Sequence, residues 1–162
     1  MTTINHWTNR AQSFLHGLQK EGCAASTAKG ESPTLYGSVY AFFALSYLGF
    51  EHLSTEELTL FVSRHQNEDG LFVGPELQGF VAKEGVLHDY EHLAMHSTCS
   101  ILPFAQEFDV SVAPLCWAHR FCDLEFLSNW LLSIDWKHAW FEGNNILFVG
   151  QALLYLRDTE KF

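Results

Sequence analysis

Apolar residues recur along most of the chain at the three- and four-residue spacing of amphipathic and buried helices. No segment alternates polar and apolar residues over the length of a strand, so little β-structure is expected. The pattern predicts helices over about residues 5–20, 33–49, 54–65, 88–108, 121–133 and 144–156. The expected fold class is therefore all-α.

Capping residues support several of these boundaries. Ser32-Pro33 has the order of an N-cap followed by a first-turn proline, and Gly49 stands where a left-handed residue commonly ends a helix. Ser54 and Glu57 have the spacing of a capping box, in which each side chain bonds the backbone of the other. These signals predict helix starts at residues 33 and 55 and a helix end before residue 49.

Glycine and proline mark the interruptions. Residues 69–85 contain several glycines and are expected to form a long loop or a short hairpin. Pro103 lies within an otherwise helical pattern. It is expected to kink or end the helix over 88–108, because proline lacks the backbone N–H that a helix needs.

The helices occur in pairs that indicate an internal repeat. Tyr36, His92 and Asn144 occupy equivalent places at the start of the three most apolar segments, with spacings of 56 (92 − 36) and 52 (144 − 92). A more amphipathic segment precedes each of them, as expected of an outer helix covering an inner one. The sequence thus predicts one domain, 1–162, of three helical hairpins at about 5–49, 54–108 and 112–157.

One stretch resembles a known superfamily. Residues 38–49 and 54–64, followed by Gln66, Gly70 and Phe72, look like one repeat of the α/α-toroid proteins, which include terpenoid cyclases and protein prenyltransferase β-subunits. Repeats of that group end in Gln-x-x-x-Gly-x-Trp or Phe. The glutamine can satisfy backbone groups at a helix end, the glycine permits a tight turn, and the aromatic residue packs between hairpins. The resemblance covers about residues 32–73.

The resemblance implies part of an α/α toroid. A full toroid has six hairpins and this chain supplies three, so either a missing C-terminal half or a homo-oligomer partner is expected to close the ring. The alternative is a compact six-helix bundle that needs no partner. The Asp-rich motif of protonating cyclases and the zinc ligands of prenyltransferases are both absent from the sequence, so no metal and no cofactor are expected.

Composition limits the class of partner. The chain has 9 Lys+Arg and 19 Asp+Glu, a net charge of −10, which disfavours nucleic acid and anionic membranes. Four cysteines without a Cys-x-x-Cys pair do not indicate a disulfide scaffold. The longest apolar run, 39–50, is shorter than a membrane span, and the polar first ten residues do not resemble a signal peptide. We therefore expect a cytoplasmic protein.

Three histidines form the most unusual local feature. His88, His92 and His96 are four residues apart, so on a helix they drift only about 40° per step and share one face. Histidine titrates near neutral pH, and His92 and His96 are the candidate catalytic general acid or base. Structural roles for all three histidines, or a metal site that lacks a recognisable third ligand, remain open alternatives.

A second cluster lies at residues 135–145, where aromatic, carboxylate and amide side chains alternate. Such groups commonly line sugar-binding clefts, with rings under apolar sugar faces and polar groups for hydroxyls. Alternatively, Asn144 is a helix N-cap and the tryptophans pack between hairpins. The candidate ligand-binding residues from both clusters and the first inner helix are Tyr36, Tyr40, His88, Trp140, Asn144 and Asn145.

The function expected from these features is that of a ligand-binding α/α-toroid domain, part of a larger enzyme acting on a carbohydrate or isoprenoid-like substrate. Carbohydrate is preferred because the equivalent inner positions are Tyr, His and Asn instead of uniformly aromatic. The alternative is a non-catalytic helical-repeat module for interaction or structure. If the repeat is real, Tyr36, His92 and Asn144 begin inner helices and converge at one end of the domain.

Overall fold

Every described element of secondary structure is helical. The computed structural model describes residues 2–19, 25, 31–49, 54–77 and 87–160, with side chains in the first and fourth helices described from His6 and Glu91 onward. Over these residues there are seven α-helices and three short 3-10 helices, and no strand. Their bounds are α1 Thr2–Leu18, α2 Leu35–Tyr47, α3 Thr55–Ser63, η1 Pro75–Leu77, α4 Leu87–Glu107, α5 Cys116–His119, η2 Arg120–Cys122, α6 Leu124–Leu132, η3 Trp136–His138 and α7 Ala139–Glu160. The prediction of an all-α protein is confirmed for this part of the chain.

Two of the expected helix ends are present. The Ser54 hydroxyl accepts from the Glu57 N–H, and the Glu57 carboxylate accepts from the Ser54 N–H, which completes the capping box at α3. Gly49 has a φ of +76° directly after the C-cap Leu48 of α2, the left-handed conformation that glycine adopts without steric cost.

The start of α2 differs from the expectation. Thr34, and not Ser32, is the N-cap, and its hydroxyl accepts from the Gly37 N–H. The Glu76 carboxylate accepts from the Leu35 N–H at 3.1 Å and lies 3.3 Å from the Tyr36 N–H. A carboxylate at a helix N-terminus is favoured by the helix dipole, so a residue forty positions away fixes where the helix begins.

The helix expected over about 88–108 is present as α4, and Pro103 does not end it, because α4 continues to Glu107. The start expected for the last helix was wrong. The last helix begins at Ala139 instead of Asn144, after the short turn η3. Residues 78–86, most of the expected loop or hairpin at 69–85, lie outside the described residues. None of the described helices is long and apolar enough to cross a membrane.

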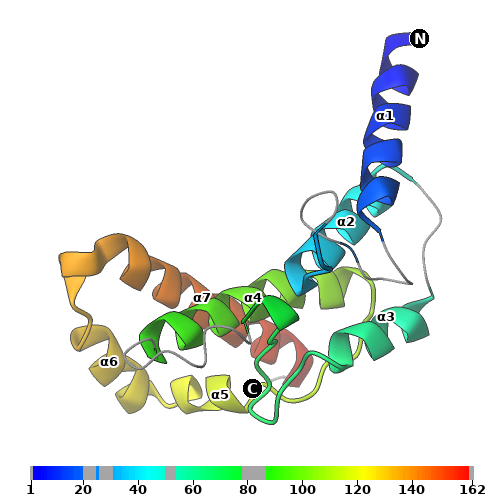
Figure 1. Cartoon of the computed structure of the whole chain (residues 1–162). Helices are drawn as coiled ribbons and strands as arrows, with labels where there is room; N and C mark the ends of the chain where they lie inside the picture. Colours follow the sequence, from blue (N-terminus) through cyan, green and yellow to red (C-terminus); the bar gives the residue numbers. More distant parts are fainter. Residues whose placement is uncertain (1, 20–24, 26–30, 50–53, 78–86, 161–162) are drawn as a thin grey trace.

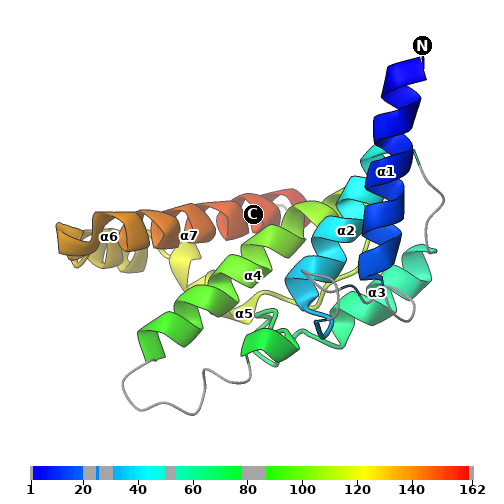
Figure 2. The same cartoon turned by 45° about the horizontal axis from the view of Figure 1, so that its top comes forward.

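Helix α4 runs through the middle of the described chain, with α2 and α3 toward one end and α5 and α7 toward the other (Figures 1 and 2). It contributes to two hydrophobic clusters. Met95, Cys99 and Leu102 pack with α5, η2 and α7, whereas Ile101 and Phe104 pack with α2 and α3. Residues of α4 are therefore buried on both flanks, and both hydrophobic clusters include residues of this one helix.

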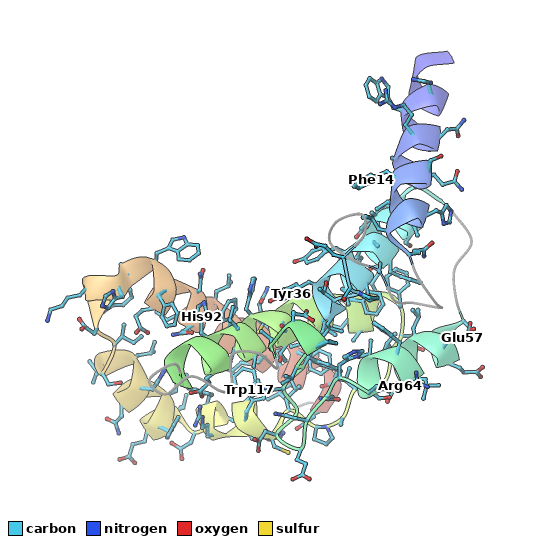
Figure 3. All side chains as sticks on the ribbon, viewed as in Figure 1. Phe14, Tyr36, Glu57, Arg64, His92 and Trp117 are labelled. Carbon is cyan, nitrogen blue, oxygen red and sulfur yellow. The ribbon has the colours of Figure 1, made fainter. Side chains whose placement is uncertain are left out.

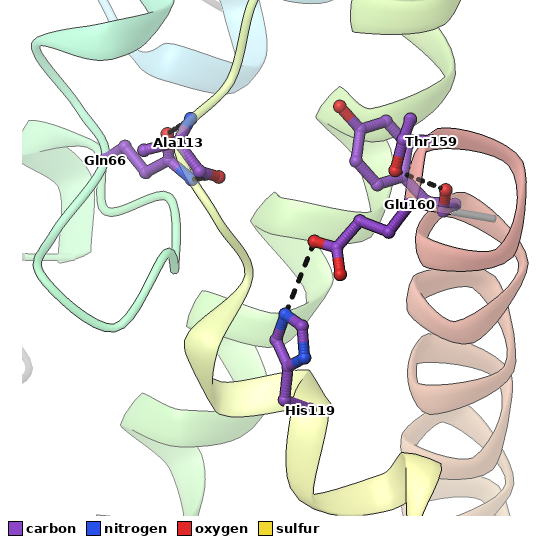
Figure 4. Close-up of polar contacts among 6 residues, drawn as sticks. Gln66, Ala113, His119, Thr159 and Glu160 are labelled. Atoms are coloured by element: carbon purple, nitrogen blue, oxygen red, sulfur yellow. Dashed lines mark hydrogen bonds and ion pairs between the residues drawn. The ribbon is translucent and has the colours of Figure 1, made fainter. Parts of the chain in front are cut away.

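The Gln66–Gly70–Phe72 motif anchors a loop to α4. The Gln66 side chain accepts from the Ala113 N–H at 2.7 Å and donates to the Ala113 carbonyl at 2.9 Å (Figure 4). It also donates to the Gly70 carbonyl at 3.1 Å. Phe72 is fully buried, and its N–H donates to the Thr98 hydroxyl on α4 at 2.9 Å. The glutamine, glycine and aromatic residue thus have the backbone-satisfying, turning and packing roles expected from their chemistry.

Gly70→Ala is expected to lower the free energy of unfolding by about 2–4 kcal/mol. Its φ is +85°, and an added Cβ would lie 2.8 Å from the Leu115 Cα, in backbone that cannot easily move. Gly49→Ala is the matched control, because its φ is +76° and nothing lies within 4 Å of the added Cβ. Gly49→Ala should lower the free energy of unfolding by about 1–2 kcal/mol, the cost of a left-handed backbone conformation alone. Urea denaturation followed by circular dichroism measures both, and equal losses would contradict the packing of this loop.

Candidate functional site

A cleft of about 740 Å³ lies between α4, α7 and the segment that joins η2 to η3. His92, labelled in Figure 3 beside α4, lies in its wall. Both polar and apolar side chains line it, among them Glu91, His92, Arg120, Trp130, Phe141 and Glu142. The cleft therefore combines the histidine-rich segment of α4 with the aromatic and carboxylate cluster at 135–145.

His92 is held in the cleft wall by two contacts from α7. Its ring stacks on that of Phe141, with centroids 3.9 Å apart and planes inclined by 17°. Its Nδ1 lies 2.8 Å from the Asn145 Oδ1, and the Asn145 Nδ2 donates to the Glu142 carboxylate at 3.3 Å. His92 is only 9% exposed, so this geometry is set by packing as well as by the hydrogen bonds.

These contacts define the tautomer of a neutral His92. A carboxylate only accepts, so the amide nitrogen of Asn145 must face Glu142 and its oxygen must face His92. An amide oxygen also only accepts, so Nδ1 of His92 carries the proton. Nε2 is then left with a lone pair that can accept a hydrogen bond or a proton.

The cleft is acidic. Glu91, Asp135 and Glu142 supply three negative charges and Arg120 one positive charge, a sum of −2 with histidine neutral. The Arg120 guanidinium lies 3.3 Å from the Glu91 carboxylate and 4.9 Å from the centre of the Phe121 ring. Both charged side chains are about half exposed, so this ion pair adds little stability and mainly fixes the position of the arginine.

A continuous series of ring contacts joins the cleft to α2. Tyr40 stacks with Tyr36 at 6.2 Å, and Tyr36 meets His96 at 5.3 Å. Phe148 of α7 then contacts both His96 and His92, at 5.2 and 5.3 Å. The side chains of the three expected inner helices, α2, α4 and α7, therefore come together through α4.

Burial changes the acidity of two rings in this series. It raises the pKa of Tyr36 to about 12, against a smaller opposite effect of the neighbouring Ser97 hydroxyl, so the phenol stays neutral. The pKa of His96 is lowered, first by burial and second by the nearby His92. His96 is therefore expected to be neutral at pH 7, although part of its side chain is exposed.

The predicted site residues separate into three groups. His92 and Asn145 line the cleft. Tyr36, Tyr40 and His96 lie in the ring series and are not among its lining residues. Trp140 and Asn144 do not line it either, and Trp140 is 81% exposed. The side chain of His88 lies outside the described residues.

The expectation that Tyr36, His92 and Asn144 begin successive inner helices was wrong in part. Tyr36 is in the first turn of α2, but α4 and α7 begin at Leu87 and Ala139, more than a turn before His92 and Asn144. The ring of Tyr36 consequently meets His96 instead of His92. The residue of α7 that binds His92 is Asn145, the neighbour of Asn144.

Several lining residues were missed. Phe141 and Glu142 of α7 have, with the predicted Asn145, the three- and four-residue spacing of one helical face, and this signal becomes visible once α7 is known to begin at Ala139. His138 of η3 was missed as well. Arg120 and Trp130 come from η2 and α6, and no local pattern in the sequence marks them.

No family model, curated protein or solved structure matches this chain. Within the described residues, no group of three or more His, Cys, Asp or Glu side chains is placed to hold a metal ion. The function is therefore argued from the cleft itself.

His92→Gln is expected to raise the pKa of His96, because it removes the second cause of the depression and leaves burial, the first, in place. The pKa of His96 should move toward its ordinary value of about 6.5 without reaching it. Histidine ring resonances followed by NMR against pH measure the change. An unchanged or lower value would show that the two rings do not interact.

The same shift gives a sign for stability. A histidine with a lowered pKa in the folded state binds its proton more readily when unfolded, so stability falls as pH decreases below about 6.5. His96→Gln should make the melting temperature less dependent on pH in that window, and an unaltered slope would show that partial desolvation of this exposed residue does not lower its pKa.

Proposed function

We propose that the cleft binds a neutral, polyhydroxylated ligand of the carbohydrate class. The observation that carries this proposal is the arrangement of His92, Asn145 and Glu142, which leaves the His92 Nε2 as an oriented acceptor beside aromatic walls. Sugar hydroxyls donate to such acceptors, and aromatic rings such as that of Trp130 provide surfaces for the apolar faces of sugars.

The charge of the cleft supports a sugar over an isoprenoid diphosphate. A diphosphate entering a site with a charge sum of −2 would lose its hydration and meet like charges. Arg120, the lining arginine, is already within 3.3 Å of Glu91. Neutral hydroxyl groups face no such penalty, and the carboxylates add further acceptors.

A catalytic use of the cleft follows from the same geometry. His92 is the proposed general base, because its Nε2 can take a proton while Asn145 accepts from Nδ1–H and Glu142 fixes the amide. His96 lies outside the lining and is proposed to act only by packing on Phe148, which also contacts the His92 ring. This activity would belong to a larger enzyme of which the chain is a domain.

The partial α/α-toroid architecture is proposed as well. Its support is the set of roles that Gln66, Gly70 and Phe72 have in the loop after α3, and the meeting of α2, α4 and α7 side chains. A toroid places ligands among its inner helices, and α4 and α7 both contribute to the cleft.

Trp130→Ala and His92→Gln are each expected to weaken binding of a neutral oligosaccharide by about tenfold, equivalent to one lost stacking surface or hydrogen bond. Isothermal titration against a panel of oligosaccharides measures this, with circular dichroism to confirm folding. Trp140→Ala is the matched control, because that tryptophan is 81% exposed and outside the cleft. It should leave affinity unchanged.

The same titration includes a prenyl diphosphate. Binding of the diphosphate alone would reverse the choice of ligand class. No binding of either class would favour the alternative, a non-catalytic interaction module.

A further inference from the structure

Helix α1 extends away from the rest of the described chain, with its C-terminal end resting near α2 (Figures 1 and 2). Leu18, at that end, is buried at 6% exposure. Trp7 and Phe14 are both 61% exposed, and Figure 3 shows Phe14 on the projecting helix. Large aromatic side chains on a projecting helix are a common feature of surfaces that bind another protein.

Four apolar residues of α1 follow a regular spacing. Trp7, Ala11, Phe14 and Leu18 are separated by four, three and four residues, the alternation of a helix that packs along one seam against other helices. Only the Leu18 end of this seam is fully buried, because Ala11 is partly exposed. Trp7 and Phe14 are not covered by the described part of the same chain, so a surface of another molecule would be needed to bury them.

A groove of suitable chemistry lies between α6 and α7. Its volume is about 620 Å³ and its lining is predominantly apolar. Leu124, Leu147 and Leu154 in this lining are 78%, 54% and 52% exposed, and Gly150 leaves open space between them. Figures 1 and 2 both place α6 at the opposite end of the molecule from α1, so α1 does not cover this groove within one chain.

The charges of the two surfaces are complementary. Residues 2–18 contain Arg10 and no acidic residue, and the Arg10 guanidinium lies over the Trp7 ring at 5.4 Å. The groove is flanked in sequence by Asp123 and Glu125, both exposed. Arg157 in the groove lining forms an ion pair with Asp158 at 2.7 Å, and the pair has no net charge. The rest of the chain is strongly acidic, which favours contact with a helix that carries an arginine and no acidic residue.

We propose that α1 of one copy of this chain docks in the α6–α7 groove of a second copy, and that the exchange is reciprocal. A reciprocal exchange closes as a two-fold dimer, in which Trp7 and Phe14 of each copy lie among the leucines of the other. Covering the exposed parts of four aromatic side chains and the matching groove surface removes about 1,000 Å² from water. That area is close to the lower limit for a specific interface, about 1,000–1,200 Å².

This proposal is independent of the ligand bound in the cleft. The groove and the cleft use different residues of α6 and α7, and the residue that they share, Phe121, lies in η2. A dimer formed in this way leaves His92 and Asn145 outside the contact.

Sedimentation of the full chain across a concentration series tests the proposal. The wild-type chain should dimerise, and Trp7→Glu with Phe14→Glu should raise the dimer Kd by at least about tenfold, because two charges would be buried in an apolar groove. Leu147→Glu with Leu154→Glu should have the same effect from the other surface. All four side chains are exposed, so circular dichroism should show that both double variants remain folded.

Two further measurements separate this arrangement from others. Leu60→Glu on α3 is the control, an exposed leucine outside both surfaces, and it should leave the dimer intact. Mixing the α1 variant with the groove variant restores one intact α1–groove contact and should give a heterodimer weaker than the wild-type dimer. A monomeric wild-type chain would overturn the proposal. So would dissociation by the α1 variant alone with the groove variant still dimeric, because α1 would then pair with α1.

Discussion

The burial of α4 on both flanks is the constraint on which the rest of this structure depends. One flank packs with α2 and α3 and the other with α5, η2 and α7, so the two hydrophobic clusters are parts of one assembly built around a single helix. Ile101, Leu102 and Phe104 lie on these flanks, with at most 2% of their surfaces exposed. His96, Pro103 and Glu107 form an exposed strip of the same helix, which leaves its two flanks for the core.

Three buried side chains of α4, those of His92, Thr98 and Cys99, bond other elements, and such bonds offset the cost of burying polar groups. The Thr98 hydroxyl accepts from the Phe72 N–H, the Cys99 thiol donates to the Phe148 carbonyl, and His92 bonds Asn145. These three bonds connect the helix to the loop after α3 and to α7. The His92–Asn145 bond lies in the wall of the cleft. The packing that stabilises α4 therefore also orients His92.

Two surfaces of the described chain have opposite chemistry. The cleft has three carboxylates, an arginine and aromatic rings, which suit a neutral ligand with many hydroxyl groups. The groove between α6 and α7 is lined mainly by leucine, which suits an apolar helix face. The proposed ligand recognition and the proposed self-association would therefore use different interactions and share Phe121 alone among the lining residues.

The sequence by itself determined the helical class, the capping box of Ser54 with Glu57 and the turn at Gly49, because these depend on neighbours within a few residues. It also singled out the two segments that meet at the cleft. Tertiary structure decided where α2 begins, because Glu76 bonds its first turn. It also decided that Asn145 and not Trp140 lines the cleft, because α7 begins at Ala139. Local patterns specify which residues can form a helix, but which face is buried and which distant side chain completes a site depend on packing between elements.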